Sequence, residues 1–374
     1  MYLITSEISS LFLRGQLRFL IERGYSVVVG TKVGDSATRP FDDGVRVEDL
    51  PFVRDPSVVA DVRGLFATWR FLRRERPGLV NASTPKAGLI GMVAAWLARV
   101  PVRVYVVRGL RFETMTGRRR TAYRFLERVA MGCATHVAFN SSSTRTVVEA
   151  DGLIARGRGV VFGAGSGNGL DVSRLADLPT KAEARRGFGL PDTAFVIGFI
   201  GRLTKDKGID DLVEAFVTLG EQNPEVWMLL VGASEAGDPI GAATLQAIDA
   251  HQRIVHVGWT DALGPVYRAL DILAFPSYRE GLPNVPLEAQ YCEVPVIGYA
   301  ASGTVDAVRD GVTGVLVPTG DLAALTHALL KSGEDPEALA ALGRAGREWV
   351  LAAFRQDVVW SAIADSYDAW TSGG

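Results

Sequence analysis

The chain has 374 residues, which is too long for one hydrophobic core and suits two domains. Hydrophobic residues make up 48% and charged residues 22%, a balance that excludes disordered and fibrous chains. The longest apolar stretch, 89–98, is about half of what a membrane-spanning helix needs. The first residues, Met1-Tyr-Leu-Ile-Thr-Ser, show neither the basic leader nor the cleavage pattern of a secretory signal. We therefore expect a cytoplasmic protein.

Charge is divided unevenly along the chain. The whole sequence has 40 basic and 42 acidic residues, but residues 1–170 hold 25 basic against 14 acidic residues, which leaves 15 against 28 for 171–374. An arginine-rich genomic composition is one explanation of this asymmetry. The other is a basic first domain that rests on an anionic surface, for which the inner face of the cell membrane is the expected partner.

Strands and helices are predicted to alternate through both halves. In the first half, short apolar and β-branched runs predict strands at 2–6, 25–30, 78–81 and 102–107, with helices at 11–23 and 85–98. In the second half, strands are predicted at 195–200, 227–232, 254–258, 272–276 and 294–299, each followed by a helix-like segment. Near-continuous apolar strands separated by helices are typical of parallel sheets covered on both faces. The sequence therefore predicts two α/β domains in series.

Two segments lie outside this alternation. Residues 160–162 run into Gly163-Ala-Gly-Ser-Gly-Asn-Gly169, whose spacing differs from the dinucleotide pattern G-x-G-x-x-G and within which no clear helix starts. We interpret this glycine-rich segment as a hinge between the domains. The tail, 338–370, is long and amphipathic and is predicted to be helical.

The first chemically informative segment follows the strand that opens the second half. There the sequence reads Gly198-Phe-Ile-Gly-Arg-Leu-Thr-Lys-Asp-Lys-Gly208, so Arg202 and Lys207 follow a strand end, where ligands of open α/β folds bind. A guanidinium beside an ammonium suits a diphosphate, because arginine contacts oxygens bidentately and lysine adds a point charge. A solvated loop is the plain alternative.

The second segment contains two carboxylates with seven residues between them. Glu280 follows a predicted strand in a glycine turn, and Glu288 lies inside the helix that begins near Pro283. Glu280 is expected to face the crevice, Glu288 to reach vicinal hydroxyls such as those of a ribose, and the amides of 281–284 to offer a phosphate site at the helix N-terminus. An ordinary pair of surface glutamates is the alternative for this segment alone.

Taken together, these residues make the sequence similar to the retaining, GT-B-fold glycosyltransferases of family 4. The resemblance covers nearly the whole chain, and its most specific parts are Glu-x7-Glu at Glu280 and Glu288, Gly-Arg-x4-Lys at Arg202 and Lys207, and the turn at 310–314. Segments 84–91, 108–113 and 167–171 are most similar to bacterial capsule and exopolysaccharide transferases.

The resemblance implies an α/β architecture of two Rossmann-like parallel-sheet domains that face a central cleft. The implied divisions are an acceptor-side domain, 1–170, a nucleotide-sugar-binding domain, 171–355, and a C-terminal helix, 356–374, that crosses back to the first domain. The implied activity is metal-independent transfer of a sugar, with retention, from a nucleotide diphosphate to a lipid-linked or small-molecule acceptor. The donor is expected to be a UDP-sugar, with no further cofactor.

The resemblance also implies a role for each site residue. Arg202 and Lys207 are implied to hold the diphosphate, Glu288 the ribose and Glu280 the donor sugar hydroxyls, with the base near 257–260. The implied donor site comprises Gly201, Arg202, Lys207, Val257, Trp259, Thr260, Glu280, Gly281, Leu282, Pro283, Asn284 and Glu288, and the catalytic group is Arg202, Lys207, Glu280 and Glu113.

The acceptor side departs from the family pattern. Ser9 and Ser10 stand where many relatives have two glycines, and Arg108, Arg111 and Glu113 follow the strand after which many relatives carry a histidine. With Arg14, the serines and arginines form the expected acceptor side. Two cysteines and four scattered histidines provide neither a disulfide framework nor a metal cluster, and we expect no metal site.

Residues 117–131 mix five arginines with the apolar residues Tyr123, Phe125, Leu126, Val129 and Met131. This segment is expected to be either an interfacial helix on anionic lipid or a core helix with a solvated arginine face. No aromatic stacking platform or reading motif accompanies the charge, which argues against nucleic-acid binding. Two alternatives to the transferase remain: a GT-B nucleotide-sugar epimerase and a non-catalytic subunit that binds a nucleotide sugar.

Overall fold

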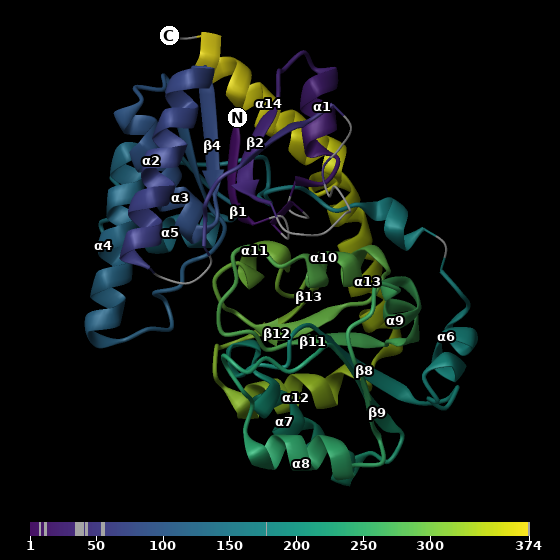
Figure 1. Ribbon diagram of the computed structural model, residues 1–374. Coiled ribbons are helices and arrows are strands. Elements are labelled where there is room, and N and C mark those ends of the chain that lie inside the picture. The colour runs from purple at the N-terminus through teal and green to yellow at the C-terminus, as the bar shows by residue number, and fades with distance from the viewer. Residues whose placement is uncertain are drawn as a thin grey trace. The chain divides into compact units, whose positions relative to one another are not determined.

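The computed structural model describes residues 1–6, 9–10, 13–33, 41, 44–53, 57–176 and 178–372. The chain forms two compact units (Figure 1). Unit 1 consists of Met1–Gly169 with Gln356–Gly374, and unit 2 consists of Leu170–Arg355. Each core cluster is made of residues from a single unit, so each unit has a hydrophobic interior of its own.

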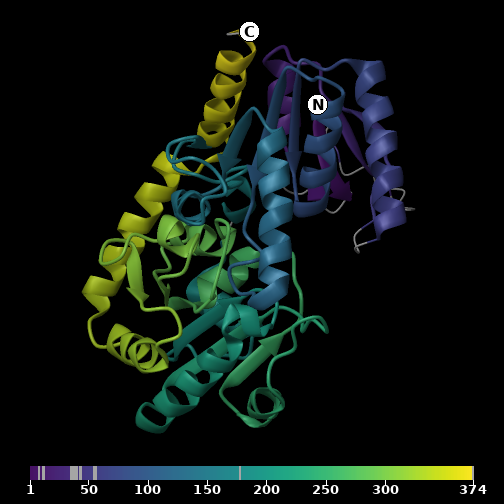
Figure 2. The ribbon, with the colours of Figure 1, turned by 90° about the vertical axis from the view of Figure 1, so that its left-hand side faces the viewer.

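Unit 1 is built on a parallel sheet in the order β3-β2-β1-β4-β5-β6-β7. Its strands are β1 (Tyr2–Ser6), β2 (Val28–Lys32), β3 (Arg46–Asp49), β4 (Leu79–Ser83), β5 (Val102–Val107), β6 (His136–Phe139) and β7 (Gly159–Val161). Its helices are α1 (Gln16–Glu22), α2 (Val58–Glu75), α3 (Pro85–Leu97), α4 (Gly117–Cys133), α5 (Ser142–Ala150) and α14 (Gln356–Ser372). On one face of the sheet α3 lies between α2 and α4, as Figure 2 shows, and α1 and α14 cover the other face.

Unit 2 contains a second parallel sheet, in the order β10-β9-β8-β11-β12-β13. Its strands are β8 (Phe195–Ile200), β9 (Val226–Val231), β10 (Ile254–Val257), β11 (Ile272–Phe275), β12 (Val296–Tyr299) and β13 (Gly314–Val317). Its α-helices are α6 (Lys181–Gly187), α7 (Ile209–Gln222), α8 (Ala242–Ala250), α9 (Leu263–Ala269), α10 (Asn284–Tyr291), α11 (Thr304–Ala307), α12 (Leu322–Ser332) and α13 (Pro336–Ala353), with 3-10 turns η2 (Val172–Leu175) and η3 (Lys205–Lys207).

The predicted class of two α/β domains with parallel sheets is confirmed. The bounds of β1, β5 and β8 are as predicted, and β2, β4, β9, β10, β11 and β12 differ from their predicted bounds by one to three residues at one or both ends. Strands β3, β6, β7 and β13 were not predicted. The sequence of β3, Arg46-Val-Glu-Asp49, is mostly charged because β3 lies at the edge of its sheet and only half of its residues are partly buried.

The tail is two helices and not one. Helix α13 ends at Ala353 and α14 begins at Gln356. At the break the carbonyl of Phe354 accepts a hydrogen bond of 2.6 Å from the amide of Leu170, and the Phe354 ring is fully buried beside Trp349. The amphipathic pattern could not show this break, because both helices have an apolar face.

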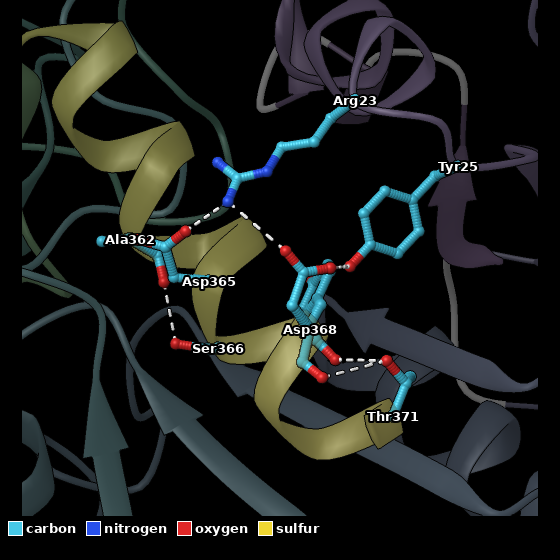
Figure 3. A network of polar contacts seen from close by, with 8 residues as sticks. Arg23, Tyr25, Ala362, Asp365, Ser366, Asp368 and Thr371 are labelled. Atoms are coloured by element: carbon cyan, nitrogen blue, oxygen red, sulfur yellow. Dashed lines mark hydrogen bonds and ion pairs between the residues drawn. The ribbon is translucent and has the colours of Figure 1, made fainter.

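Polar and aromatic contacts hold helix α14 against the rest of unit 1. Arg23 pairs with Asp365 and Asp368, and the hydroxyl of Tyr25 donates to Asp368 (Figure 3). Deeper in the unit, the hydroxyl of Tyr367 lies 2.5 Å from Asn81 Nδ2, from which it accepts a hydrogen bond. These contacts account for the placement of 356–374 in unit 1.

The glycine-rich segment is also fastened to unit 1. The amide of Ser166 donates to the carbonyl of Asn140 at 2.7 Å, and Gln16 Nε2 donates to the carbonyl of Gly167 at 3.1 Å. The chain enters unit 2 at Leu170 and leaves it after Arg355, and these two residues form a parallel bridge. The glycine-rich segment itself is therefore part of unit 1, and a hinge between the units could lie only where the chain crosses between them, beside this bridge. The hinge stays a prediction.

Within the described part of the chain, no helix combines the length and the apolar character needed to cross a bilayer.

Candidate functional site

The site lies where the strand order of the second sheet reverses. Strands β9 and β10 lie on one side of β8, and β11, β12 and β13 lie on the other, so the reversal falls between β8 and β11. At such a point the loops that follow the two neighbouring strands diverge and leave a crevice at the carboxyl ends. In unit 2 these loops are the segments that begin at Gly201 and Pro276.

The loop after β8 requires a glycine at its end. Gly208 has φ +70°, and a Cβ at this position would lie 2.1 Å from the carbonyl oxygen of Pro276, in the loop after β11. Only glycine accommodates both the left-handed backbone and this close approach. Gly208 is also the C-cap of η3 and the N-cap of α7, so its close approach to Pro276 places η3, which carries Lys207, against the neighbouring loop.

Lys207 and Glu280 meet at this reversal point. The Nζ of Lys207 contacts Oε1 of Glu280, and the side chains are only 16% and 14% exposed. The amide of Glu280 donates to the carbonyl of Ser302 at 2.9 Å, and Gly303 (φ +76°) leaves room for the Glu280 backbone, 2.7 Å from where a Cβ would lie. We expected both residues to face one crevice, and in the structure their side chains are in contact.

Arg202 has a different partner. Its guanidinium contacts Oε2 of Glu235, in the loop after β9, and its side chain is 60% exposed. A diphosphate at this edge would therefore compete with Glu235 for Arg202. Sequence reasoning missed Glu235, because a lone acidic residue in a loop carries no recognisable signal.

Glu288 lies on α10, separate from the Lys207–Glu280 contact. Its Oε2 accepts a hydrogen bond of 2.6 Å from the hydroxyl of Tyr267 on α9. Burial raises the pKa of Glu288 above its ordinary value, although the bond from Tyr267 acts in the opposite direction. Burial and the nearby Glu288 carboxylate raise the pKa of Tyr267 well above its usual range, which keeps its hydroxyl protonated as a donor. Tyr267 was not predicted.

Helix α10 begins at Asn284, with Pro283 as its N-cap and no side-chain capping bond. The first amides of any helix lack intrahelical acceptors, so this end can receive a phosphate oxygen. Gly281 and Leu282 are partly buried and Asn284 is exposed. The predicted base-binding segment lies after β10, where Trp259 is 74% exposed and the hydroxyl of Thr260 accepts a bond from the amide of Ala262.

In unit 1 the strand order reverses between β1 and β4, and the predicted acceptor residues lie near this point or after β5. Ser9 and Ser10 follow β1, and the Ser10 hydroxyl is buried. Arg14 is exposed, and its carbonyl accepts a bond of 3.1 Å from Asn168. The end of β1 is joined to the residue after β4 by a hydrogen bond of 2.7 Å between the hydroxyls of Thr5 and Thr84.

The loop after β5 contains a partly buried cation. Burial lowers the pKa of Arg108 to about 10, and the nearby hydroxyls of Tyr2 and Tyr367 act in the opposite direction. A Cβ at Gly167 would lie 2.4 Å from Arg108 Nη1, so the glycine-rich segment passes directly over the guanidinium. Arg108 therefore packs against the glycine-rich segment within unit 1. Arg111 is exposed and Glu113 is partly buried.

Comparison with known proteins shows the protein family to which the chain belongs. Residues 180–349 match the model of glycosyl transferases group 1, and residues 11–165 match the glycosyl transferase 4-like domain. The chain is 31% identical over 369 residues to the capsular polysaccharide biosynthesis glycosyltransferase CapM of Staphylococcus aureus, covering 99% of this chain and 96% of CapM.

Two further proteins are similar. The UDP-Gal:alpha-D-GlcNAc-diphosphoundecaprenol alpha-1,3-galactosyltransferase of Escherichia coli is 26% identical over 300 residues, covering 79% of this chain and 76% of that protein. The structure of HepE from Anabaena in complex with UDP-glucose matches with a TM-score of 0.78 at 22% identity, covering 98% of each chain. The two family models and the similarity to CapM over nearly the whole chain define a glycosyltransferase. The chain belongs to the GT-B-fold glycosyltransferases of family 4.

Proposed function

We propose that this protein is a retaining glycosyltransferase that moves a sugar from a UDP-sugar to a lipid-linked saccharide or a small-molecule acceptor in polysaccharide biosynthesis. The observation that carries the proposal is the contact between Lys207 and Glu280 at the reversal point of the second sheet, with both side chains mostly buried. A cation for phosphate and a carboxylate for sugar hydroxyls are thereby adjacent.

The comparisons support a UDP-sugar donor, a lipid-linked acceptor and a role in polysaccharide biosynthesis through the proteins they name. CapM is named for capsular polysaccharide biosynthesis, the Escherichia coli enzyme for transfer from UDP-Gal to a diphosphoundecaprenol-linked sugar, and HepE was solved with UDP-glucose. A nucleotide-sugar donor is common to the second and third, which favours a UDP-sugar here. A diphosphoundecaprenol acceptor is a membrane lipid, which fits a cytoplasmic enzyme at the inner face of the membrane.

The proposed mechanism assigns the protein a positioning and electrostatic role. The bond between the sugar C1 and the phosphate oxygen breaks, the acceptor hydroxyl oxygen bonds to C1 on the same face, and the hydroxyl proton passes to the departing phosphate. Lys207, Arg202 and the N-terminus of α10 would stabilise the charge that develops on the diphosphate. Glu280 would orient the donor sugar, and Glu288 the ribose. We propose that these cations make a protein-held metal or further cofactor unnecessary.

A thermal-shift titration with UDP, GDP, ADP and NAD tests the donor class. A nucleotide at about one hundred times its dissociation constant stabilises the protein by roughly 2.7 kcal/mol, enough to rank the four. Selective stabilisation by UDP that is lost in Lys207→Ala would support the proposal. Full turnover in both Lys207→Ala and Glu288→Ala would contradict it.

The same preparation separates the alternatives. Incubating the nucleotide sugar without acceptor yields a new nucleotide sugar only with an epimerase. A non-catalytic subunit would bind the donor but transfer nothing in the presence of acceptor lipid extracts. A transferase consumes the donor only when an acceptor is added.

We further propose that an anionic membrane binds the outer surface of unit 1, but through α2 as well as 117–131. On α4, Arg120 and Arg124 pair with Asp151 and Arg128 donates to the carbonyl of Gly152, which engages three of the five arginines. Helix α2 exposes an apolar stripe beside basic residues: Val58 is 82%, Val59 81%, Val62 61% and Phe66 57% exposed, and Arg63, Arg70 and Arg73 are exposed. Such a helix fits an anionic bilayer interface.

Vesicle co-sedimentation tests this surface. Binding should require anionic lipid, weaken as salt rises, and fall in Phe66→Ser, because the charged headgroups and the apolar boundary act together. Leu245→Ser is the matched control, because Leu245 is 41% exposed on α8 of unit 2. Equal binding to neutral vesicles would contradict the proposal.

A further inference from the structure

The loops after β8 and β11 carry adjacent charges in opposite order. The first loop reads Asp206-Lys207 and the second reads Arg279-Glu280. Lys207 contacts Glu280, and Asp206 Oδ2 lies 2.9 Å from Arg279 Nη2. Two ion pairs therefore join the same two loops side by side, and the side chains of the second pair are 19% and 28% exposed.

The second pair is the part of this arrangement that the donor would leave intact. In the proposed function, the diphosphate takes Lys207 and the sugar takes Glu280, so their contact must break when the donor binds. Asp206 and Arg279 have no such role. Their neighbours in the chain are the two donor-binding side chains, so holding Asp206 to Arg279 also holds the backbones that carry Lys207 and Glu280.

The surrounding contacts fix the rest of the two loops. The amide of Tyr278 donates to the carbonyl of Asp206 at 3.0 Å, and the hydroxyl of Tyr278 donates to Asp211 Oδ2 on α7 at 2.6 Å. The amide of Asp206 donates to Asp238 Oδ2 at 2.9 Å. These contacts fix the backbone of the two loops, and the Asp206–Arg279 pair adds a side-chain contact beside Lys207 and Glu280.

We propose that Asp206 and Arg279 are positioning residues for the donor site: their ion pair keeps Lys207 and Glu280 aimed into the crevice after the donor has separated them. This inference rests on the proposed function of Lys207 and Glu280. Removing Arg279 would leave the Asp206 carboxylate to compete with the diphosphate for Lys207. Removing the charge of Asp206 would leave the Arg279 guanidinium to compete with Lys207 for Glu280.

The experiment compares Arg279→Gln, Arg279→Lys and Asp206→Asn in the full chain, with UDP as the binding probe and donor turnover as the rate. We expect Arg279→Gln to lower kcat/KM for the donor by about 10- to 100-fold and to weaken UDP binding, since a displacement near 1 Å costs about that much. Arg279→Lys should restore most of the loss, because it keeps a positive charge that can pair with Asp206.

The double variant Asp206→Asn with Arg279→Gln adds a second test. It leaves no unpaired charge beside Lys207 or Glu280, so its kcat/KM should fall no further than that of the worse single variant. If Arg279→Gln does not fold, UDP binding and kcat/KM are compared in Asp206→Asn and Arg279→Lys instead.

Lys181→Gln is the matched control. Lys181 pairs with Asp271 at 2.5 Å, beside the amino ends of the same two strands, so its loss removes an ion pair from unit 2 without reaching the donor site. UDP binding and turnover should then remain those of the wild type.

Three results would overturn the inference: wild-type kinetics in Arg279→Gln, a fall in thermal stability with unchanged UDP affinity and kcat/KM, or an equal loss of kcat/KM in Lys181→Gln. Failure of the wild-type protein to bind any nucleotide would instead overturn the proposed function, so the two failures are distinguishable.

Discussion

Glu127 is a buried carboxylate in unit 1 that no proposed step uses. It lies on α4 with its Oε2 accepting a bond of 2.8 Å from the hydroxyl of Tyr105. Burial raises the pKa of Glu127 from 4.5 to about 6, against the opposing effect of the Tyr105 bond. The folded state therefore holds the proton more tightly than the unfolded state, so stability falls as the pH rises from 4.5 to 6.

We expect Glu127→Gln to stabilise unit 1 by about 2 kcal/mol above pH 7, because the amide keeps an acceptor for Tyr105 and carries no charge. At pH 4.5 and below, where the native carboxyl is already protonated, the advantage should shrink toward zero. Urea unfolding at both pH values measures the difference, with the exposed Glu22→Gln as control. A gain that is the same at both pH values would contradict the assigned cause.

The proposed donor residues were easier to predict than their partners. Lys207 and Glu280 could be placed together from sequence because both follow apolar strands, and the carboxyl ends of parallel strands share one edge. Glu235, Tyr267 and Arg279 could not, because the contacts they make depend on strand order and loop conformation. In the first unit, the partly buried position of Arg108 under Gly167 depends on a segment almost 60 residues away in the chain.

Among the helices, α14 shows which contacts hold an element in place. Arg23 pairs with Asp365 and Asp368 of this helix (Figure 3), and these side chains are exposed, whereas Tyr367 is buried among aromatic rings and hydrogen-bonds Asn81. Exposed pairs contribute little because water screens them. We expect Tyr367→Ala to cost unit 1 about 3–5 kcal/mol through the lost ring and the cavity. Arg23→Ala should leave the unfolding midpoint unchanged.

Urea unfolding followed by limited proteolysis of the last helix would measure both variants. Tyr367→Ala should make 356–372 accessible to protease before the rest of unit 1 unfolds. Comparable destabilisation by the two substitutions would show that the surface ion pairs, and not the buried ring, hold α14.

Elements were predictable where their apolar pattern is strong. The strands β1, β5 and β8 were located in full because their residues are mostly buried on both faces. The charged edge strand β3 was not predicted, since it lacks an apolar run, and the break between α13 and α14 was implied by the family resemblance and not by the amphipathic pattern. The local apolar pattern indicates that a residue is buried, but it does not indicate which distant segment of the chain buries it.

At the scale of the whole molecule, the charge asymmetry persists when the C-terminal helix is assigned to unit 1. Its residues add three acidic groups, so unit 1 holds 25 basic against 17 acidic residues and unit 2 holds 15 against 25. The negative unit is the one that contains the proposed diphosphate site. Anion binding there therefore depends on the local placement of Arg202, Lys207 and the α10 N-terminus, and not on the net charge of the unit.

The division into two units predicts two unfolding transitions. Each unit has core clusters on both faces of its sheet, and the chain crosses between the units only twice, so calorimetry should resolve two steps. The Glu127→Gln variant identifies the step of unit 1. UDP at about one hundred times its dissociation constant should stabilise the other step by roughly 2.7 kcal/mol and leave the first in place, because the proposed donor residues all belong to unit 2. An equal shift of both steps would show that the nucleotide is held by residues of both units, and the donor assignment would then have to include the loops after β1, β4 or β5.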